Sequence, residues 1–465
     1  MTHDVIVIGA GSAGLTAAGG LAMFGLRVAL VEGGEMGGEC LNTGCVPSKA
    51  LIAAAARAHA AKRATLGVSL AATVDWAGVS AHMHDAIATI APHDAQARFE
   101  ALDIEVIRAP ARFRDARTLL VGNRELHAPR IVIATGSQPA IPTIDGLAEV
   151  PYLTNETLFA LDRLPAHLIV LGGGAVGCEM AQAFVRLGAR VTVIEADAAL
   201  AREDAEAATL VLDGLRGEGV DLRVGVAAVK AERTDTGVRL TLAGGETVEG
   251  SHLLVATGRR ANIAALDLGA AGVLYCADGI AVDPRRRTSQ RHIFAIGDCR
   301  AGPRFTHVAG YEGSLVVLQI ALGWPGKVDW RALPRAIYTD PELAQIGLTE
   351  AEARAQYAEI TVTREAFADN DRAVTEGDAR GFIKLVRRGG RVLGVTIVGA
   401  GAGDLLLPWS QVITGKASTF ALGSAVIAYP TRSEIAKVAA FAEWAPRVFG
   451  AWPKRWAQLL ARLRR

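Results

Sequence analysis

Cysteine is scarce in this sequence, with five residues among 465. Small secreted domains that depend on disulfides are rich in cysteine, so the sequence does not belong to that class. An excess of one sign of charge is also missing, because 49 Lys and Arg residues stand against 48 Asp and Glu residues and leave a net charge of +1. Nothing in this balance requires a nucleic acid or an acidic partner.

Long hydrophobic runs and a basic leader are absent as well. No stretch of about 18 or more apolar residues runs without glycine or charge, which predicts that no helix spans a membrane. We expect a strand from Asp4 onward, and no basic segment precedes it, which predicts no cleavable signal and a cytoplasmic location. In a reducing compartment, a cysteine pair is more often catalytic or metal-binding than structural.

The length and the composition favour a large α/β protein. A chain of 465 residues predicts about three domains. A hydrophobic fraction of 51% together with 51 glycines is typical of buried parallel strands joined by tight turns.

Residues 3–32 predict a dinucleotide-binding unit. An apolar strand ends in a GxGxxG pattern at Gly9, Gly11 and Gly14, a helix follows, and a second apolar strand ends at Glu32. The glycines permit a tight turn and the close approach of a pyrophosphate to the helix N-terminus, and the acid binds ribose hydroxyls.

The same unit recurs at residues 168–195. Its glycines are Gly172, Gly174 and Gly177, and its acid is Glu195. The first glycine and the acid lie 23 positions apart in both copies. Because chance would not repeat both the pattern and the spacing, we predict two dinucleotide sites rather than glycine-rich turns that bind nothing.

Each unit closes with a strand that ends in Ala-Thr-Gly, at Gly136 and at Gly258. The first closing strand comes much later than the second, so the first unit carries an insertion with helices between about residues 48 and 100. The strand at 293–296 then returns to the first unit. Asp298, directly after that strand, suits a hydrogen bond from a cofactor hydroxyl, and a plain turn aspartate is the alternative.

From residue 334 onward, alternating strands at 336–341, 381–386 and 392–398, with a hairpin turn at 388–391, predict an association module. The expected fold class is therefore α/β, with two Rossmann-like dinucleotide-binding domains, one inserted in the other, plus a C-terminal α+β dimerisation domain. The expected bounds are 1–145 with 260–330 for the first domain, 146–259 for the second, 331–440 for the third, and 441–465 for a basic amphipathic tail.

Residues 37–49, GGECLNTGCVPSK, contain two cysteines five positions apart. In a regular helix the Cα atoms of Cys40 and Cys45 would lie about 8 Å apart, whereas a disulfide needs about 4.4–6.8 Å. If the two pair, Gly44 supplies freedom for a distorted turn, and the next helix begins near Pro47. Such a disulfide at a helix N-terminus is labile, since the positive helix end lowers the thiol pKa. A structural bridge or two unrelated thiols is the alternative interpretation.

Together these segments resemble the FAD-dependent pyridine nucleotide-disulfide oxidoreductases. The motifs that carry the resemblance are GGECLNTGCVPSKA, both GxGxxG units, both ATG strands, AIGDC and TDPELAQIGLTEAEA, and the match spans roughly residues 4–440. That family includes dihydrolipoamide dehydrogenase, glutathione reductase and mercuric reductase. Its members are homodimers in which the C-terminal domain completes the partner's active site.

The resemblance implies that the first unit binds FAD and the second binds a nicotinamide dinucleotide. The implied FAD positions are Gly9, Gly11, Gly14, Glu32, Lys49, Ala111, Thr135, Gly136 and Asp298. The implied nicotinamide positions are Gly172, Gly174, Gly177, Glu195 and Gly258. The acid Glu195 favours NADH over NADPH because it would repel a 2′-phosphate, and Arg202 nearby could soften that preference.

The resemblance also assigns catalytic roles. A hydride passes to the flavin and on to a Cys40–Cys45 disulfide, because a flavin links two-electron donors to sulfur chemistry. Cys45 is then the thiol next to the flavin, and Cys40 attacks the substrate. Lys49 lies one turn beyond Cys45, where its charge lowers the thiolate pKa. Glu179 is expected to pair with Lys49 beneath the flavin, and a surface glutamate is the alternative. The other cysteines, Cys178, Cys276 and Cys299, are expected to be buried spectators.

One departure concerns the C-terminal His-Pro-Thr signature, whose histidine is the acid/base of the family. Here Tyr429 stands in its place, followed by Glu434. A phenol with a pKa near 10 is a poor base at neutral pH, so turnover of ordinary disulfides should be slow. The tyrosine resembles mercuric reductase, since a soft metal needs thiolates and no proton donor. However, no cysteine follows Cys299, so the C-terminal pair that delivers metal in that enzyme is missing.

The tail beyond residue 440 mixes tryptophans and leucines with basic residues. It is expected either to pack on the protein's own dimer or to touch an anionic membrane surface. The predicted function is NAD(P)H-dependent reduction of an external disulfide, metal ion or other acceptor through FAD and the cysteine pair, with no resident metal. The alternatives are a dihydrolipoamide dehydrogenase-type enzyme without its base, or a low-turnover redox-sensing or membrane-docked flavoprotein.

Overall fold

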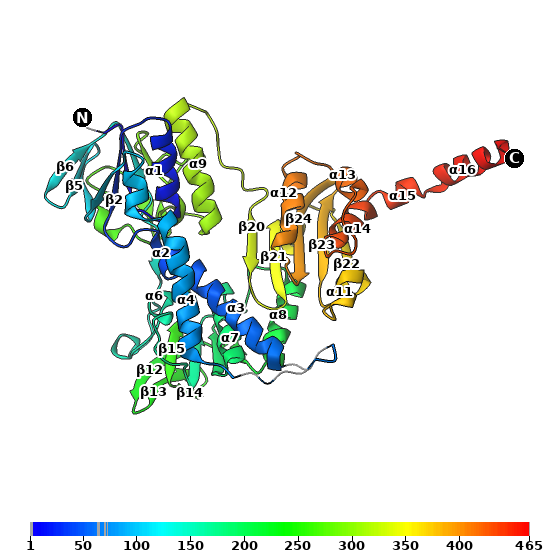
Figure 1. The fold of residues 1–465 in the computed structure, drawn as a ribbon, viewed down its shortest axis with the longest axis horizontal. Coiled ribbons are helices and arrows are strands. Elements are labelled where there is room, and N and C mark those ends of the chain that lie inside the picture. The colour runs from blue at the N-terminus through cyan, green and yellow to red at the C-terminus, as the bar shows by residue number, and fades with distance from the viewer. Residues whose placement is uncertain (1–2, 63–65, 69–70, 72, 465) are drawn as a thin grey trace.

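The computed structural model describes residues 3–62, 66–68, 71 and 73–464. Its first sheet is parallel and has the strand order β19-β7-β1-β2-β3. The strands are β1 (Val5–Ile8), β2 (Val28–Glu32), β3 (Glu105–Arg108), β7 (Arg130–Ile133) and β19 (Ile293–Ala295). Because β19 joins β7, the chain returns to this sheet after a long excursion, which places residues far apart in sequence at one sheet edge (Figure 1).

Alternate residues of the first sheet face two different layers, as the pleat requires. Val5 and Val7 pack with the helices α1 (Ser12–Met23) and α9 (Thr306–Leu322). Ile6 and Ile8 pack with a small antiparallel sheet on the other side. The strands of that small sheet are β4 (Ala111–Asp115), β5 (Thr118–Val121) and β6 (Arg124–His127). Both faces are covered, which explains why β1 is apolar throughout.

The excursion builds a second parallel sheet with the order β11-β10-β9-β15. Its strands are β9 (His167–Leu171), β10 (Arg190–Glu195), β11 (Asp221–Val224) and β15 (His252–Val255), and its helices are α7 (Ala175–Leu187) and α8 (Ala205–Gly217). An antiparallel sheet of β12 (Ala228–Thr234), β13 (Gly237–Leu242) and β14 (Thr247–Gly250) packs against it. The strands β8 (Ser137–Pro139) and β16 (Arg259–Ala261) pair where the chain leaves and re-enters the first unit.

Among the described residues between β2 and β3, four α-helices form the insertion that the sequence predicts. They are α2 (Gly38–Asn42), α3 (Cys45–Lys62), α4 (Trp76–Ile90) and α5 (Gln96–Glu100). The expected start of α3 near Pro47 is confirmed, since the helix begins two residues earlier, at Cys45. A helix tolerates proline in its first turn because the amides there have no partner inside the helix.

The C-terminal module is an antiparallel sheet with the order β20-β21-β24-β23-β22. Its strands are β20 (Pro334–Ile337), β21 (Glu342–Gly347), β22 (Thr361–Ala366), β23 (Phe382–Arg388) and β24 (Arg391–Gly399). The hairpin turn predicted at 388–391 is confirmed. The helices are α10 (Glu350–Gln356), α11 (Asp371–Thr375), α12 (Leu407–Ile413), α13 (Thr419–Ser424) and α14 (Glu434–Ala442). Shorter elements elsewhere are α6 (Asn155–Leu158), β17 (Tyr275–Cys276) and β18 (Gly279–Ile280).

The strand expected at 336–341 is shorter than predicted, because β20 ends at Ile337. The next backbone amides leave the sheet to bond side chains of α7. The amide of Tyr338 donates to Glu179 Oε1 at 3.0 Å, and that of Asp340 donates to Gln182 Oε1 at 2.8 Å. This segment therefore fastens the C-terminal module to the second nucleotide unit.

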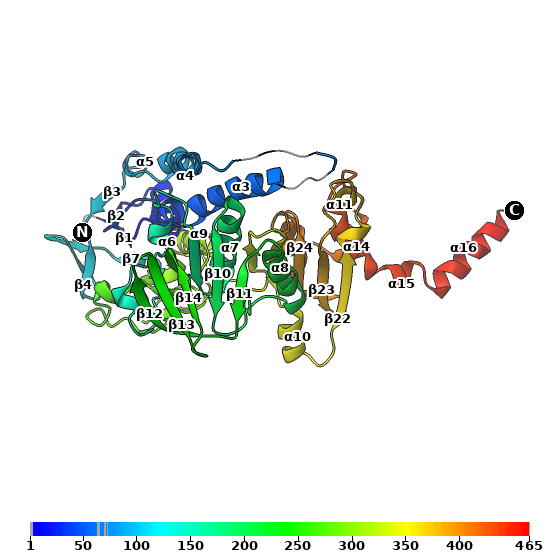
Figure 2. The same cartoon turned by 90° about the horizontal axis from the view of Figure 1, so that it is seen from below.

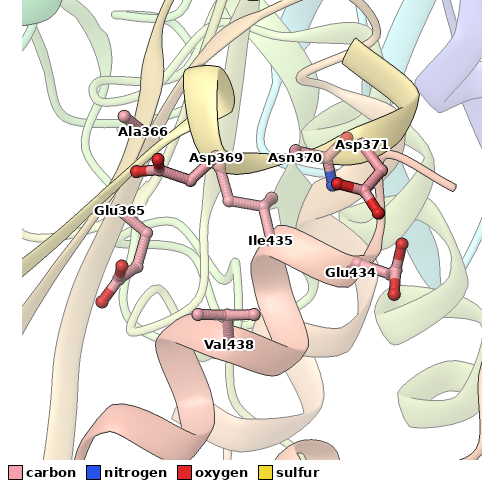
Figure 3. Close-up of a pocket in the computed structure, with 8 residues that line it drawn as sticks. All are labelled: Glu365, Ala366, Asp369, Asn370, Asp371, Glu434, Ile435 and Val438. Carbon is pink, nitrogen blue, oxygen red and sulfur yellow. The ribbon is translucent and has the colours of Figure 1, made fainter. Parts of the chain in front are cut away.

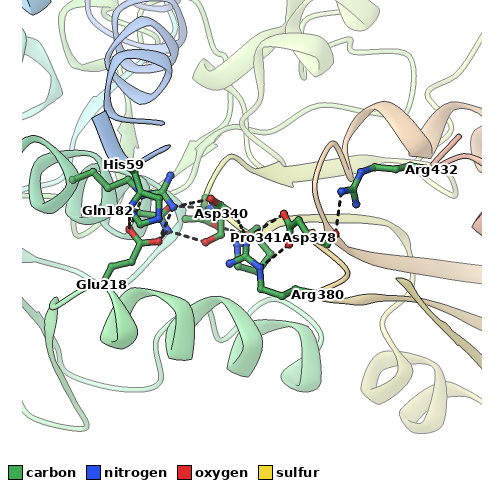
Figure 4. A network of polar contacts seen from close by, with 10 residues as sticks. His59, Gln182, Glu218, Asp340, Pro341, Asp378, Arg380 and Arg432 are labelled. Atoms are coloured by element: carbon green, nitrogen blue, oxygen red, sulfur yellow. Dashed lines mark hydrogen bonds and ion pairs between the residues drawn. The ribbon is translucent and has the colours of Figure 1, made fainter. Parts of the chain in front are cut away.

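A network of charges around Asp340 strengthens the same junction (Figure 4). Arg186, almost fully buried on α7, bonds Glu218 at 2.6 Å and Asp340 at 2.8 Å. Arg380 of the C-terminal module bonds Asp340 at 2.6 Å from the other side. His59 on α3 lies 3.7 Å from Glu218. The oxygens of Glu218 and Asp340 already face a guanidinium, so this cluster is an ion-pair network rather than a cation site.

The tail consists of α15 (Ala445–Val448) and α16 (Ala451–Leu463). Figures 1 and 2 both show it extending away from the body of the molecule. None of the described residues of α16 is buried. Across the described part of the chain, no helix is both long and apolar enough to cross a membrane.

Candidate active site

The two cysteines of the central motif lie on either side of a break between two helices. Cys40 belongs to α2 and Cys45 is the first residue of α3. A Cβ on Gly44 would lie 3.0 Å from the Glu39 carbonyl oxygen and 3.3 Å from Cys40 Cα, so only glycine fits this turn without movement. Both cysteines are thiols here and are hydrogen-bond partners.

The environment shifts the pKa values of the two thiols in opposite directions. The hydrogen bond from Cys40, helped by Thr306 and by the charge of Lys49, lowers the pKa of Cys45 to about 6 against the opposing effect of burial. The same hydrogen bond, together with burial, raises the pKa of Cys40. At neutral pH the pair therefore holds one thiolate, at Cys45, and one thiol, at Cys40.

Thr306 is a contact that sequence reasoning missed. It begins α9, and its Oγ1 lies 3.3 Å from Cys45 Sγ. A single threonine at the start of a helix belongs to no sequence motif, so the sequence did not indicate this contact. Its neighbour His307 is engaged elsewhere, with Nε2 at 3.0 Å from the Pro334 carbonyl oxygen. Burial lowers the pKa of His307, which is then a neutral imidazole.

The expected pair of Lys49 and Glu179 is present. Lys49 Nζ donates to Glu179 Oε2 at 2.7 Å, and the Glu179 side chain is 5% exposed. The surface alternative for Glu179 is therefore wrong. The ammonium also lies 4.5 Å from the ring centroid of Tyr338, a cation–π contact that the sequence did not indicate. Lys49 is thus held between an acid of α7 and a ring from the C-terminal module.

The two glycine loops have the same internal geometry. A Cβ on Gly9 would lie 2.4 Å from the Ala134 carbonyl oxygen, and one on Gly14 would lie 1.7 Å from that of Gly9. In the second loop, the corresponding distances are 2.5 Å for Gly172 and 2.0 Å for Gly177. These four glycines are required for packing of the strand, turn and helix.

The middle glycine of each loop has room for a Cβ instead. The nearest atom to a Cβ on Gly11 would be 3.8 Å away, and a Cβ on Gly174 would meet nothing within 4 Å. Gly136 and Gly258 at the closing strands are also open. This is the arrangement that lets a pyrophosphate approach the backbone.

The acids at the strand ends lie against their loops. Glu32 accepts hydrogen bonds from the amides of Ala10 at 2.5 Å and Gly34 at 2.6 Å. Glu195 accepts from the amides of Gly173 at 2.7 Å and Asp197 at 2.9 Å. Each carboxylate is thereby held next to the glycine turn, where a ribose would lie.

Three further predicted FAD positions surround the first loop. Thr135 Oγ1 is buried and has no hydrogen-bond partner among the described residues. Asp298 accepts from Ser137 Oγ at 2.7 Å. Ala111 is the first residue of β4. The residue before it, Pro110, packs against Gly33, since a Cβ on Gly33 would lie 3.4 Å from Pro110 Cα. An orphaned hydroxyl, open glycines and anchored acids fit a dinucleotide, and FAD bound there would relay electrons between a nicotinamide and sulfur.

Glu39 and Arg259 form an ion pair next to the cysteine turn that the sequence did not reveal. Arg259 Nη1 donates to Glu39 Oε1 at 2.6 Å, its Nη2 donates to Glu39 Oε2, and Asn155 Nδ2 donates to Oε1 at 2.8 Å. Burial raises the pKa of Glu39 to about 7, and Arg259 opposes that rise. Arg259 directly follows the second Ala-Thr-Gly, so the pair ties the residue before Cys40 to the second nucleotide unit.

Tyr429 and Glu434 lie apart from the cysteines within one chain. Tyr429 is 71% exposed and donates a hydrogen bond to Asp371 Oδ2 at 2.7 Å. That bond raises the pKa of Tyr429. Glu434 begins α14 and lines a hollow of about 120 Å³ with Asp371 (Figure 3). In the described residues, no hydrogen bond or ion pair joins either side chain to the cysteine pair.

The remaining cysteines divide into two groups. Cys178 and Cys299 are buried, and burial raises the pKa of each to about 12. They are inert spectators, as expected. Cys276 is exposed on β17, so the expectation that it is buried is wrong. Its hairpin of two-residue strands is too short to cover it.

Comparisons with known proteins agree with this geometry. Residues 3–313 match the model described as pyridine nucleotide-disulphide oxidoreductase, and residues 333–440 match that family's dimerisation domain. The mercuric reductase of Shigella flexneri is 36% identical over 455 residues, which are 94% of this chain and 80% of the relative. The dihydrolipoyl dehydrogenase of Geobacillus stearothermophilus is 34% identical over 451 residues, 94% of this chain and 95% of the relative.

Among solved structures, the Cu(II) complex of the HOCl-induced flavoprotein disulfide reductase RclA from Escherichia coli superimposes with a TM-score of 0.85 at 28% identity. The superposition covers 93% of this chain and 98% of the RclA chain. The predicted α/β fold class and family resemblance are confirmed. The chain belongs to the pyridine nucleotide-disulphide oxidoreductase family and is an enzyme that uses FAD and NAD(P)H.

Proposed function

We propose that the enzyme takes two electrons from NAD(P)H, reduces its own Cys40–Cys45 disulfide by way of FAD, and passes the electrons to an external acceptor. The reduction breaks the S–S bond and leaves one thiolate and one thiol. The geometry of the pair carries this proposal, because Cys40 and Cys45 are hydrogen-bonded to each other across the Gly44 turn. The thiolate resides at Cys45, and Cys40 keeps a proton that must leave before its sulfur attacks the acceptor. Lys49, paired with Glu179, supplies the positive charge that holds the thiolate.

Anaerobic titration with NADH, followed by acceptor assays, tests the proposal. Cys40→Ser should still accept hydride at the flavin but should lose reduction of the acceptor. Cys45→Ser should lose the long-wavelength absorbance that a thiolate gives beside an oxidised flavin. If both variants reduce the acceptor at the wild-type rate, electrons leave the flavin directly and the proposal is wrong.

For the acceptor, we propose a disulfide or a thiophilic metal ion. The similarity to mercuric reductases over 94% of the chain supports the metal ion. The absence of cysteine after Cys299 means that metal would reach Cys40 without a C-terminal cysteine pair. A panel of lipoamide, glutathione disulfide, Hg²⁺, Cu²⁺ and a quinone, each assayed with NADH, identifies the class.

A low-turnover redox-sensing role is the second candidate, and Tyr429 favours it. Its hydroxyl is bonded to Asp371, which raises the pKa of the phenol and makes it a still poorer base. Turnover below about 1 s⁻¹ with every acceptor of the panel would support this candidate over an ordinary catalytic role.

The dimerisation domain makes the protein a homodimer. We propose that Tyr429 and Glu434 act at the partner's cysteine pair, which is supported by their distance from the cysteines' hydrogen-bond network within one chain. We also propose NADH as the preferred donor, because Glu195 holds the position of the ribose. Rates of flavin reduction by NADH and NADPH test that preference.

We propose, finally, that the tail of residues 441–465 gives the dimer a peripheral contact with a membrane surface. The exposed, uncovered α16 supports this proposal. The redox chemistry proposed for the enzyme does not depend on such a contact.

A further inference from the structure

The helix α16 has an apolar face and a basic face. At about 100° of rotation per residue, its large apolar side chains fall within one arc of about 100° of the helix circumference. They are Trp452, Trp456, Leu459, Leu460 and Leu463. Arg455 and Arg462 border this arc on one side, and Arg464 borders it on the other. The smaller residues Pro453, Ala457 and Ala461 lie on the Arg464 side, between the apolar arc and Lys454 on the opposite face.

The apolar face is not covered by the protein. Trp452 is 73% exposed, Trp456 50% and Leu463 74%. The two indoles stack on each other with ring centroids 6.2 Å apart, and they present one continuous aromatic surface. A continuous, exposed apolar face on a helix without a buried residue marks an interaction site.

The charge of the tail identifies the kind of partner. Residues 444–465 contain six basic residues and no Asp or Glu, although the whole chain is balanced at +1. Basic residues beside a face of tryptophan and leucine are the pattern of helices that lie in the headgroup region of an anionic bilayer. A nucleic acid would use the charges but would leave the apolar face in water.

The placement of the tail agrees with a partner outside the protein. The match to the family's dimerisation domain ends at residue 440, before α15. From there α15 and α16 extend away from the body in both views (Figures 1 and 2). The junction is firm, because Trp444 Nε1 donates to Thr419 Oγ1 at 3.0 Å and Phe441 contacts Phe449.

We infer that α16 docks on an anionic phospholipid surface, with Trp452 and Trp456 in the headgroup region and Arg455 and Arg462 beside the lipid phosphates. The inference rests on the peripheral contact proposed for the tail and names its ligand. A homodimer carries two such helices, and two helices that reach the same surface bind it more tightly than one alone.

Flotation of the FAD-loaded, full-length protein with vesicles tests this inference. One set of vesicles is phosphatidylcholine alone, and the other contains phosphatidylglycerol. We expect the protein to float with the anionic vesicles only, and to be released by high salt, which screens surface charge. Tryptophan emission should shift to shorter wavelength on binding.

Two variants divide the site into its parts. Arg455→Gln with Arg462→Gln should weaken partitioning about 25-fold, at about fivefold for each basic residue near the surface. Trp452→Ser with Trp456→Ser should abolish the emission shift. The matched control, Arg233→Gln with Arg291→Gln, removes two exposed arginines from the body and should bind as the wild type does.

A chain that ends at Gly450 lacks α16 but keeps the Trp444 and Phe449 contacts. If this shortened chain floats as well as the wild type does, the inference is wrong. The inference is also wrong if light scattering shows that the shortened chain is a monomer, because α16 would then belong to the dimer interface. Equal binding to both kinds of vesicle would overturn the anionic ligand while leaving a membrane contact. Flavin reduction by NADH, measured in parallel, reports on the redox function separately.

Discussion

At the scale of single residues, the two active-site thiols show how position alone separates two identical side chains. Cys45 begins a helix, within reach of Thr306 and of the charge of Lys49, and its pKa falls to about 6. Cys40 donates to it and lies half-buried, so its pKa rises. Neither thiol would be distinguished by residue type, and the environment decides which one is the thiolate.

The pH dependence of the reduced enzyme follows from the pKa of Cys45. A lowered thiol pKa means that the thiolate is present above about pH 6 and is lost as the pH falls through that value. We expect the thiolate–flavin absorbance of the two-electron-reduced enzyme to fade on acidification, with a midpoint near pH 6.

Lys49→Met should move that midpoint upward, since it removes a charge that favours the thiolate. Lys230→Met is the matched control, because Lys230 lies on the remote strand β12 and pairs with Glu232. A midpoint that stays in place in Lys49→Met would show that Lys49 does not tune the thiol.

At the scale of elements, the two glycine loops separate packing from binding. Gly9 and Gly14 have no room for a Cβ, whereas Gly11 has its nearest neighbour at 3.8 Å. We propose that two glycines of the GxGxxG pattern serve the packing of the fold and that the third, Gly11, serves the approach of the cofactor.

Two alanine variants distinguish these roles. Gly14→Ala should lower the melting temperature and the yield of folded protein, because the new Cβ would lie 1.7 Å from the Gly9 carbonyl oxygen. Gly11→Ala should keep the circular dichroism spectrum of the wild type, yet weaken FAD binding by about tenfold or more, because its methyl group occupies the approach of the pyrophosphate. The flavin-to-protein ratio after dialysis measures this, and full flavin retention in Gly11→Ala would contradict it.

The contact between α7 and the C-terminal module depends on a buried charge. Arg186→Met leaves the largely buried Glu218 without its guanidinium, while Asp340 keeps Arg380. The free energy of unfolding should therefore fall by about 3 kcal/mol, the low end of the range for a broken buried ion pair. Urea unfolding monitored by circular dichroism measures the loss.

The control Arg216→Met removes an exposed i,i+3 pair with Asp213 and should cost no more than about 0.5 kcal/mol. Adding Glu218→Gln to Arg186→Met should recover part of the loss. Equal stabilities of the Arg186 and Arg216 variants would mean that the network contributes nothing to the junction.

At the scale of the whole molecule, the side chains expected at the acceptor site lie on different modules of one chain. Tyr429 lies on the C-terminal module and bonds Asp371, while the cysteines lie between the two nucleotide units. We propose that the dimerisation domain, which brings a second copy against the first, is the means by which these residues meet.

Tyr429→His should restore a base to that position. We expect turnover with lipoamide or glutathione disulfide to rise by about tenfold or more, since a positioned base contributes about 10²–10⁴ in favourable cases. Reduction of Hg²⁺ should change by less than about twofold, because thiolate ligation needs no proton donor. Steady-state rates with NADH measure both, and an equal rise with both acceptors would contradict the assigned role.

Local patterns predicted the parts of the molecule that depend on short segments. The glycine loops, the hairpin at 388–391 and the acid after each second strand were all readable, because each needs only a few neighbouring residues. The end of β20 was not, since it depends on Glu179 and Gln182, which are more than 150 positions away. Tyr338, Thr306 and Arg259 were missed for the same reason.

By itself, the sequence determined the fold class, the family and both cofactors, because strand, turn and helix signals are local and the motif spacing is specific. Only the tertiary structure decided that Cys40 and Thr306 bond Cys45 and lower its pKa, that Tyr338 covers Lys49, that Arg259 holds Glu39, and that Tyr429 lies away from the cysteines of its own chain. Those properties depend on contacts between residues that lie far apart in the sequence. Such contacts produce no local or periodic pattern from which they could be predicted.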